Sequence, residues 1–372
     1  MHKHTLDRYQ RQIILPEIGL EGQKILNNAR VLCVGAGGLG APVLMYLAGA
    51  GVGTLGIVEE DTVTLSNLHR QILFNSSQLE QSKLHCAVKF VKAINPEISI
   101  LPFHTMLTAN NVEEIFNKFD LVIDGTDNFS AKFLINDYTY KIGIPMIYGA
   151  IVGFEGQIAL FNTENSTCYR CLYPEPPSNY IPNCAEYGVL GPLPGLIGSM
   201  QALECIKWLL VSKGAQSTTF NPLINKLFTI NAKSMETQIY KLSKSKNCPT
   251  CSKPQNEIVL NCGQSSMCKF FEVLTITPKE LTQILKSICL VDIRESYKWQ
   301  VSNIPLSVNW PFSKLAISSF ESIPKSIKES ETVVIYCQHG FKSHAAIQTL
   351  FKKLPGKKFL NLSGGYTAWN EM

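Results

Sequence analysis

The chain has 372 residues, which is more than one ordinary domain holds and suggests two or three domains. Hydrophobic residues make up 45% and charged residues only 17%, so the chain is expected to fold around a sizeable core. A formal net charge of +5 is too small to predict a nucleic-acid partner. Residues 1–12 are polar and carry no apolar signal segment, so the twelve cysteines are expected to be reduced, in a cytoplasmic protein.

The first half of the chain alternates short apolar runs with helical patterns. Strands are predicted at 31–34, 54–58, 99–103, 121–124 and 144–148, with helices at 41–49 and 110–119. This alternation predicts a parallel, doubly wound α/β sheet. Residues 31–58 carry no charge, but their glycines favour a buried strand–helix–strand unit over a membrane helix, so no membrane partner is expected. A strand at 153–160, a proline-rich loop at 167–195 and an apolar helix at 197–211 are predicted to follow.

The last hundred residues read as a second, smaller α/β unit. Thr277-Pro278-Lys279-Glu280 fits a capping box at the start of a helix. Strands are expected at 288–292, 333–337 and 358–362, with helices at 277–286 and 343–354. The predicted division is a domain at 1–253, a linker at 254–270 and a domain at 271–372.

A glycine-rich loop, Gly35-Ala36-Gly37-Gly38-Leu39-Gly40, follows the first predicted strand and opens a helix. The glycines Gly35, Gly37, Gly38 and Gly40 would let the backbone approach a nucleotide phosphate at the helix N-terminus. Glu59, at the end of the next strand, is positioned to accept hydrogen bonds from ribose hydroxyls. The motif alone does not distinguish a nicotinamide dinucleotide from ATP.

Polar residues further along the chain favour ATP. The run Ser66–Gln71 contains Arg70, and Lys83 follows it, so two cations are available to stabilise charge on phosphate oxygens and on departing pyrophosphate. Hydride transfer has no such requirement. Asp124 and Asp127 follow the next strand and offer the oxygen ligands that Mg²⁺ prefers.

Two CxxC pairs predict a metal site. Cys168-Tyr169-Arg170-Cys171 and Cys248-Pro249-Thr250-Cys251 together supply four soft thiolate ligands, which suits tetrahedral zinc with no open position. A redox role would need only one pair, so Zn²⁺ bound by Cys168, Cys171, Cys248 and Cys251 is the favoured interpretation.

The remaining cysteines differ in setting. Cys337 lies between an apolar strand and a helix, where loop N–H groups would stabilise an anionic sulfur such as a persulfide. Cys184 lies in the proline-rich loop beside Glu186. Cys33, Cys205 and Cys289 fall in apolar stretches and are expected to pack in cores. No role is predicted for Cys86, Cys262 and Cys268.

Residues 5–251 resemble the MoeB/ThiF/HesA-like activating enzymes of ubiquitin-like proteins. The similar stretches are Arg8–Gln12, Gly35–Gly40, Ser66–Gln71, Lys83, Asp124–Asn128 and Cys184–Ser199. The resemblance implies a Rossmann-like adenylation domain that uses ATP and Mg²⁺, and it also favours zinc at the four cysteines.

The same resemblance assigns residue roles. Glu59 would bind ribose, although this position is usually Asp, and Asn67 and Asn128 would belong to the nucleotide-binding set. Arg70 and Lys83 would bind the phosphates, and Asp127 would bind Mg²⁺. Arg11 would reach across a homodimer interface into the partner's site, and Cys184 corresponds to a loop cysteine that forms a thioester or acyl disulfide in some members.

The C-terminal region resembles a rhodanese domain. The similar pieces are Val291–Glu295, the loop that begins at Cys337, and Ser363–Trp369. Rhodanese loops commonly carry Arg where this sequence has Lys342, which keeps the charge but not the planar fork of donors.

Together the two resemblances imply one enzyme that is both an adenylyltransferase and a sulfurtransferase. It would adenylate the C-terminal glycine of a ubiquitin-like sulfur carrier of the MoaD/ThiS type, which ends in Gly-Gly. A persulfide on Cys337, loaded by thiosulfate or another upstream persulfide donor, would then displace AMP and lead to a thiocarboxylate, with Cys184 as the candidate for reductive cleavage.

Three alternatives stay open: a nicotinamide-dependent oxidoreductase, a tRNA-modifying ATP-dependent relative and a non-catalytic carrier-binding scaffold. The sequence does not identify the carrier. It also does not choose between molybdopterin biosynthesis, thiamine synthesis, tRNA thiolation and other pathways.

Overall fold

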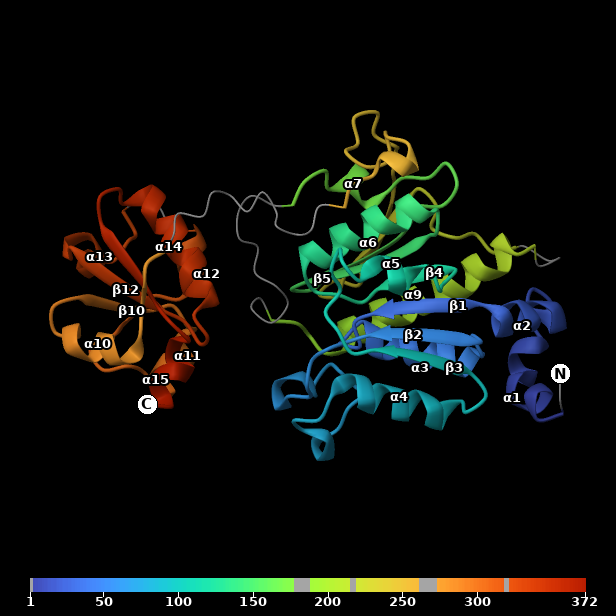
Figure 1. The fold of residues 1–372 in the computed structure, drawn as a ribbon, viewed down its shortest axis with the longest axis horizontal. Coiled ribbons are helices and arrows are strands. Elements are labelled where there is room, and N and C mark those ends of the chain that lie inside the picture. The colour runs from blue at the N-terminus through green and yellow to red at the C-terminus, as the bar shows by residue number, and fades with distance from the viewer. Residues whose placement is uncertain (1–2, 177–187, 215–218, 261–272, 318–320) are drawn as a thin grey trace. The chain divides into compact units, whose positions relative to one another are not determined.

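The computed structural model describes residues 3–176, 188–214, 219–260, 273–317 and 321–372 (Figure 1). The chain divides into two compact units, Met1–Ser265 and Ser266–Met372. The division falls inside the stretch 254–270 that was expected to be a linker. Its described part contains a short 3-10 turn, Gln255–Glu257, which contacts a helix of the first unit.

The first unit is built on an eight-stranded sheet in the order β3-β2-β1-β4-β5-β6-β7-β8. Its strands are β1 Arg30–Val34, β2 Thr54–Val58, β3 Ser99–Phe103, β4 Leu121–Asp124, β5 Met146–Val152, β6 Glu155–Phe161, β7 Lys226–Asn231 and β8 Glu236–Lys241. Strands β1 to β5 are parallel, as predicted.

The prediction of a parallel sheet covered the strands up to 144–148, and beyond β5 the sheet continues with strands of the opposite direction. Strands β6, β7 and β8 are antiparallel to their neighbours. Only Gly153 and Phe154 separate β5 from β6, and so short a connection can only return the chain antiparallel, because a parallel crossover needs about a dozen residues.

Helices cover both faces of this sheet. They are α1 Lys3–Ile13, α2 Gly19–Asn28, α3 Gly40–Ala50, α4 Lys83–Ile94, α5 Val112–Phe116, α6 Phe129–Ile142, α7 Tyr169–Leu172 and α9 Pro192–Ser212. Side chains of α2, α3, α4 and α9 form one buried cluster, and those of α5 and α6 form a second cluster. Figure 1 shows α5 and α6 on the side of the sheet opposite α3 and α4.

Two details of the helices bear on the predictions. Helix α9 begins at Pro192, five residues before the predicted start at 197, since proline is tolerated in the first turn of a helix. The uncharged stretch 31–58 folds as β1, α3 and β2, and no helix among the described residues is long and apolar enough to span a bilayer.

The second unit contains a parallel five-stranded sheet in the order β11-β10-β12-β13-β9. Its strands are β9 Thr275–Ile276, β10 Cys289–Asp292, β11 Val308–Asn309, β12 Thr332–Tyr336 and β13 Lys358–Leu362. Its helices are α10 Pro278–Ile284, α11 Ser296–Val301, α12 Phe312–Ile317, α13 Lys325–Glu329, α14 Phe341–Lys353 and α15 Gly365–Asn370.

The predicted capping box of α10 is confirmed. The Thr277 hydroxyl accepts a hydrogen bond from the Glu280 backbone N–H, and the Glu280 carboxylate accepts one from the Thr277 backbone N–H at 2.8 Å. Both ends of the box therefore satisfy backbone donors that the helix itself leaves unpaired.

Candidate functional site

The glycine loop lies where the sheet order changes direction, between the carboxyl ends of β1 and β4, which is where ligands bind in doubly wound sheets. Gly35 has φ +92°, and its backbone N–H donates to the Val58 carbonyl at 2.8 Å. A Cβ on Gly40 would lie 1.9 Å from the Gly35 carbonyl oxygen. The close turn of the loop therefore requires glycine at both positions.

Glu59 is bound to this loop. One carboxylate oxygen accepts from the Ala36 backbone N–H at 2.9 Å, and the other accepts from the backbone N–H groups of Glu60 and Asp61 at 3.0 Å. Each carboxylate oxygen has a second lone pair, so the half-buried group can still accept a hydroxyl donor.

The predicted cations are joined to the same edge of the sheet. Lys83 is 4% exposed, and its ammonium lies 2.9 Å from the Asp61 carboxylate. Asp61 thus links Lys83 to Glu59, a connection that the sequence analysis did not anticipate.

Arg70 lies directly against the glycine loop. Its Cγ is 3.7 Å from the position that a Cβ on Gly38 would occupy, and its guanidinium donates to the Ser66 carbonyl at 2.8 Å. Asn67 helps form this turn, because its carbonyl accepts from the Arg70 backbone N–H at 3.1 Å. Pro194, in the first turn of α9, closes the other side at 3.0 Å from the same Gly38 position.

The two acidic residues after β4 differ in their surroundings. Asp124 is fully buried, pairs with the Lys132 ammonium at 2.8 Å and accepts two hydrogen bonds from Thr126. Asp127 is exposed, and within the described residues its carboxylate makes no hydrogen bond or ion pair. Asn128 caps α6 by accepting from the Ala131 backbone N–H at 2.8 Å. Of the two carboxylates, only that of Asp127 is available to a cation.

The structure does not bring Arg11 into this site, and it does not test the prediction for Cys184. Arg11 is exposed on α1, and no hydrogen bond or ion pair joins it to another described residue. Cys184 lies outside the described residues. The chain that follows it, however, returns to the site, since a Cβ on Gly191 would lie 2.2 Å from the His69 carbonyl oxygen.

The four cysteines of the two CxxC pairs lie together, and their sulfur atoms are all within 4.8 Å of one another. The Sγ distance is 3.4 Å from Cys168 to Cys248 and 3.3 Å from Cys171 to Cys251. Tetrahedral zinc with Zn–S bonds of about 2.3 Å requires sulfur–sulfur separations of about 3.8 Å, so the cluster fits such an ion with small adjustments.

Hydrogen bonds among the four thiols shift their pKa values in opposite directions. Hydrogen bonding with Cys168 lowers the pKa of the Cys171 and Cys248 thiols, while hydrogen bonding with Cys171 raises the pKa of Cys168. The arrangement thus favours thiolate at some positions, and thiolate is the form that binds a metal.

Buried cysteines elsewhere serve packing. Cys33, Cys205 and Cys289 all lie in hydrophobic clusters, as predicted, and burial raises the pKa of each thiol. Cys86 joins the same cluster as Cys33. Cys262 and Cys268 lie outside the described residues.

Cys337 begins a loop between β12 and α14. Its sulfur accepts from the Gly340 backbone N–H at 3.1 Å and from the Ser343 hydroxyl at 3.5 Å. Gly340 has φ +90°, which turns its N–H toward the sulfur. Two donors therefore converge on Cys337, which is only 3% exposed. The side chain of Lys342 is partly exposed at the start of α14.

The first turn of α15 supports this loop. The backbone N–H of Tyr366 donates to the Cys337 carbonyl at 2.8 Å, and that of Thr367 donates to the Gln338 carbonyl at 3.0 Å. A Cβ on Gly365 would lie 2.4 Å from the Cys337 carbonyl oxygen, so the close approach requires glycine.

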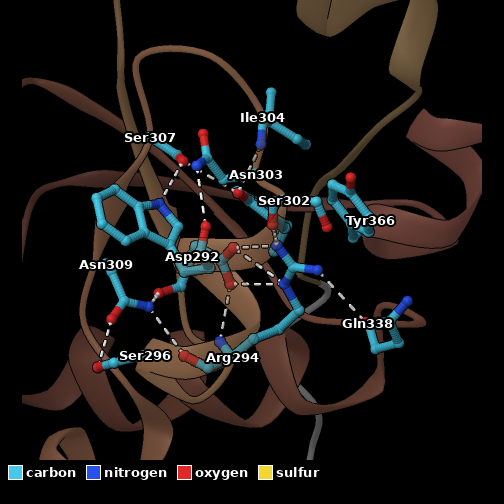
Figure 2. A network of polar contacts seen from close by, with 12 residues as sticks. Asp292, Arg294, Ser296, Ser302, Asn303, Ile304, Ser307, Asn309, Gln338 and Tyr366 are labelled. Carbon is cyan, nitrogen blue, oxygen red and sulfur yellow. Dashed lines mark hydrogen bonds and ion pairs between the residues drawn. The ribbon is translucent and has the colours of Figure 1, made fainter.

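Arg294 connects the end of β10 with the same loop (Figure 2). Its guanidinium forms an ion pair of 2.7 Å with the fully buried Asp292 and donates to the Ser302 carbonyl at 2.7 Å. It also reaches the Gln338 side chain at 3.4 Å, and it lies 3.9 Å from the centre of the Tyr366 ring. Burial opposes the charge, but the hydrogen bonds that Arg294 donates to Asp292, together with the Asp292 charge, outweigh burial and raise the pKa of Arg294.

Comparison with known families agrees with both halves of the structure. The ThiF family profile matches residues 9–250. The chain belongs to the ThiF family. The rhodanese-like domain profile matches residues 277–372, so this ThiF family member carries a rhodanese-like domain after the adenylation fold. The family resemblances and the fold class inferred from the sequence are confirmed.

Curated relatives match this chain along nearly its whole length. The chain is 36% identical over 378 residues to the probable adenylyltransferase/sulfurtransferase MoeZ of Mycobacterium tuberculosis, covering 99% of this chain and 94% of the relative. It is 34% identical over 386 residues to the adenylyltransferase and sulfurtransferase UBA4 of Yarrowia lipolytica, with the same coverage.

Among solved structures, the ThiF family fold is shared with E. coli MccB. The structure of MccB with ATP matches with a TM-score of 0.57 and 20% identity, covering 66% of this chain and 75% of the MccB chain. At this identity the likeness shows the fold alone.

Proposed function

We propose that this protein is an adenylyltransferase and sulfurtransferase that activates the C-terminal glycine of a ubiquitin-like sulfur carrier and converts it to a thiocarboxylate. The observation that carries the proposal is that one chain holds both a nucleotide-type glycine loop with its cations and a buried cysteine loop with two donors on the sulfur. The names of relatives that match nearly the whole chain support the same enzyme class.

The adenylation step is assigned to the edge of the sheet around the glycine loop. Gly35–Gly40 would bind the phosphates through backbone N–H groups, and Glu59 would accept from the ribose. Arg70 and Lys83 would stabilise negative charge on the phosphates as the carrier's carboxylate attacks the α-phosphorus and pyrophosphate leaves.

Mg²⁺ is assigned to Asp127, whose exposed carboxylate, unlike that of Asp124, makes no hydrogen bond or ion pair with a described residue. Asn67 and Asn128 are assigned to nucleotide binding through the turns that they form beside Arg70 and Asp127. Arg11, exposed on α1, is assigned to the partner's site in a homodimer.

The sulfur step is assigned to Cys337. A persulfide anion on Cys337, loaded from thiosulfate or another persulfide donor, attacks the acyl-adenylate carbonyl and releases AMP, which leaves an acyl disulfide. A thiol then attacks the Cys337 sulfur of that disulfide, so that the carrier leaves as a thiocarboxylate and a disulfide forms between Cys337 and the attacking thiol. Cys184 is the candidate for this thiol.

Zn²⁺ is assigned to the four-cysteine cluster. Four thiolates would hold it with no open position, so the ion would supply structural stability rather than catalysis. It would join the chain segment after β8 to the segment after β6.

The test separates the two chemical steps. Asp127→Ala is expected to abolish carrier-dependent ATP–pyrophosphate exchange, because Mg²⁺ loses its ligand. Cys337→Ala is expected to keep that exchange while stopping transfer of thiosulfate sulfur to the carrier, followed by intact mass. Glu60→Ala, a nearby exposed acid, is the matched control. Exchange at the wild-type rate in Asp127→Ala, or unimpaired sulfur transfer in Cys337→Ala, would refute the corresponding assignment.

A further inference from the structure

The two CxxC turns are connected by a carboxylate that belongs to neither of them. Asp137 lies on α6 and is 8% exposed. It accepts from Arg170 through two parallel hydrogen bonds, from Nε and Nη2, both at 2.8 Å. It also accepts from the Thr250 hydroxyl at 2.8 Å.

The two partners of Asp137 each lie within a different CxxC pair. Arg170 stands between Cys168 and Cys171, and Thr250 stands between Cys248 and Cys251. One carboxylate therefore receives a side chain from the middle of each cysteine pair, although the pairs are far apart in the sequence. Paired hydrogen bonds to a guanidinium also fix orientation as well as distance.

Further contacts hold this carboxylate and its partners in place. The Asn136 amide donates to Asp137 at 3.0 Å, and the Asn136 side chain accepts from the Tyr169 backbone N–H at 2.7 Å. The Arg170 guanidinium lies 4.5 Å from the centre of the Phe133 ring. The charge of Asp137 is thus compensated, as a buried carboxylate requires.

We propose that Asp137 is a positioning residue for the metal site: it aligns the two CxxC turns so that their four sulfurs converge before an ion binds. The proposal rests on the zinc assignment made above. It follows from the general behaviour of metal sites, in which groups hydrogen-bonded around the ligands set affinity, and their loss typically costs about 10–100-fold.

The experiment measures zinc release from the purified full-length protein with a chromophoric chelator. Asp137→Ala is expected to release zinc about 10–100-fold faster than wild type. Asp137→Asn still accepts a hydrogen bond from Thr250 but loses the charge that orients Arg170. Its rate of zinc release is expected to lie between those of wild type and Asp137→Ala. Thr250→Val removes one link at constant size and is expected to give a smaller acceleration.

The matched control is Glu204→Gln. Glu204 is also a buried, ion-paired carboxylate of the first unit, held by Lys207 on α9, but no hydrogen bond or ion pair joins it to Cys168, Cys171, Cys248 or Cys251. It is expected to lower the melting temperature without changing zinc release. Substitution of Co²⁺ supplies a second readout, because the visible spectrum of a four-thiolate site changes only if the arrangement of the sulfurs changes.

Three results would overturn the proposal. Zinc release and Co²⁺ spectra equal to wild type in both Asp137→Asn and Thr250→Val would show that the carboxylate does not align the turns. Equal acceleration in Glu204→Gln would show a general loss of stability instead. If the wild-type protein takes up no zinc, the zinc assignment itself fails. If it takes up zinc but the variants release it at the wild-type rate, only the positioning role of Asp137 fails.

Discussion

Lys83 carries its charge in a nearly buried position, 4% exposed, with a carboxylate partner at 2.9 Å that is itself exposed. A buried ammonium whose partner faces solvent can exchange that partner for a phosphate without leaving an unpaired charge inside the protein. This setting distinguishes Lys83 from a surface lysine and supports its assignment to the nucleotide.

Lys83→Met keeps the apolar stem and removes the charge. We expect ATP–pyrophosphate exchange to fall by about 10²–10³-fold, the usual effect of removing one donor that stabilises transition-state charge. Lys89→Met, an exposed lysine on the same helix, is the control and should retain the wild-type rate. A rate within twofold of wild type for Lys83→Met would remove this residue from the site.

At the level of single residues, motif spacing predicted site residues such as Lys83 and the CxxC cysteines. It did not predict the carboxylates that hold these segments in place. Asp61 meets Lys83 across 22 positions, and Asp137 meets Arg170 across 33 and Thr250 across 113. No local pattern marks such pairs, because folding alone brings them together. The same reason explains why Asp124 and Asp127 looked equivalent in the sequence, whereas burial beside Lys132 commits only Asp124 to an internal ion pair.

At the scale of elements, α6 joins the nucleotide edge to the cysteine cluster. Lys132 binds Asp124 near its first turn, Asp137 binds both CxxC turns, and the Tyr140 hydroxyl donates to the Lys253 carbonyl at 2.9 Å. The buried face of this helix is thus largely polar, and it carries hydrogen bonds where most buried helices carry only aliphatic packing.

That composition also explains which elements could be predicted. Strands β1, β2 and β4 are continuous apolar runs and were identified, whereas α6 buries Lys132, Asn136 and Asp137 and so lacks an apolar stripe. Strand β8 has every residue exposed and shows no hydrophobic alternation. Sequence periodicity reports burial of apolar groups, so elements placed by hydrogen bonds escape it.

Two glycines at opposite ends of α3 test the glycine loop. Gly40→Ala would place a methyl group 1.9 Å from a carbonyl oxygen and should destabilise the first unit by several kcal/mol, with loss of ATP binding. Gly49→Ala meets no atom within 4 Å and should instead stabilise by up to about 1 kcal/mol. Denaturant unfolding measures the free energy of unfolding of both variants. An unchanged free energy of unfolding for Gly40→Ala would contradict the close turn.

At the scale of the whole molecule, the two units have separate hydrophobic cores. Leu44 lies fully buried in a cluster of the first unit, and Leu350 lies fully buried in a cluster of the second. Truncating either side chain should cost its own unit about 2–5 kcal/mol.

We therefore expect Leu350→Ala to lower the melting temperature of the second unit, seen as one calorimetric transition, and to leave ATP–pyrophosphate exchange unchanged. Leu44→Ala should lower the melting temperature of the first unit and leave thiosulfate sulfurtransferase activity unchanged. If either variant shifted both transitions equally, the units would not unfold independently.

The burial of Cys337 has a consequence for the order of events. Cys337 is only 3% exposed and its sulfur already accepts two hydrogen bonds, so it admits one reactant at a time. On the proposed mechanism, the sulfur donor must therefore depart before the adenylated carrier approaches. The enzyme would then work by two separate half-reactions, with the sulfur held on the protein between them.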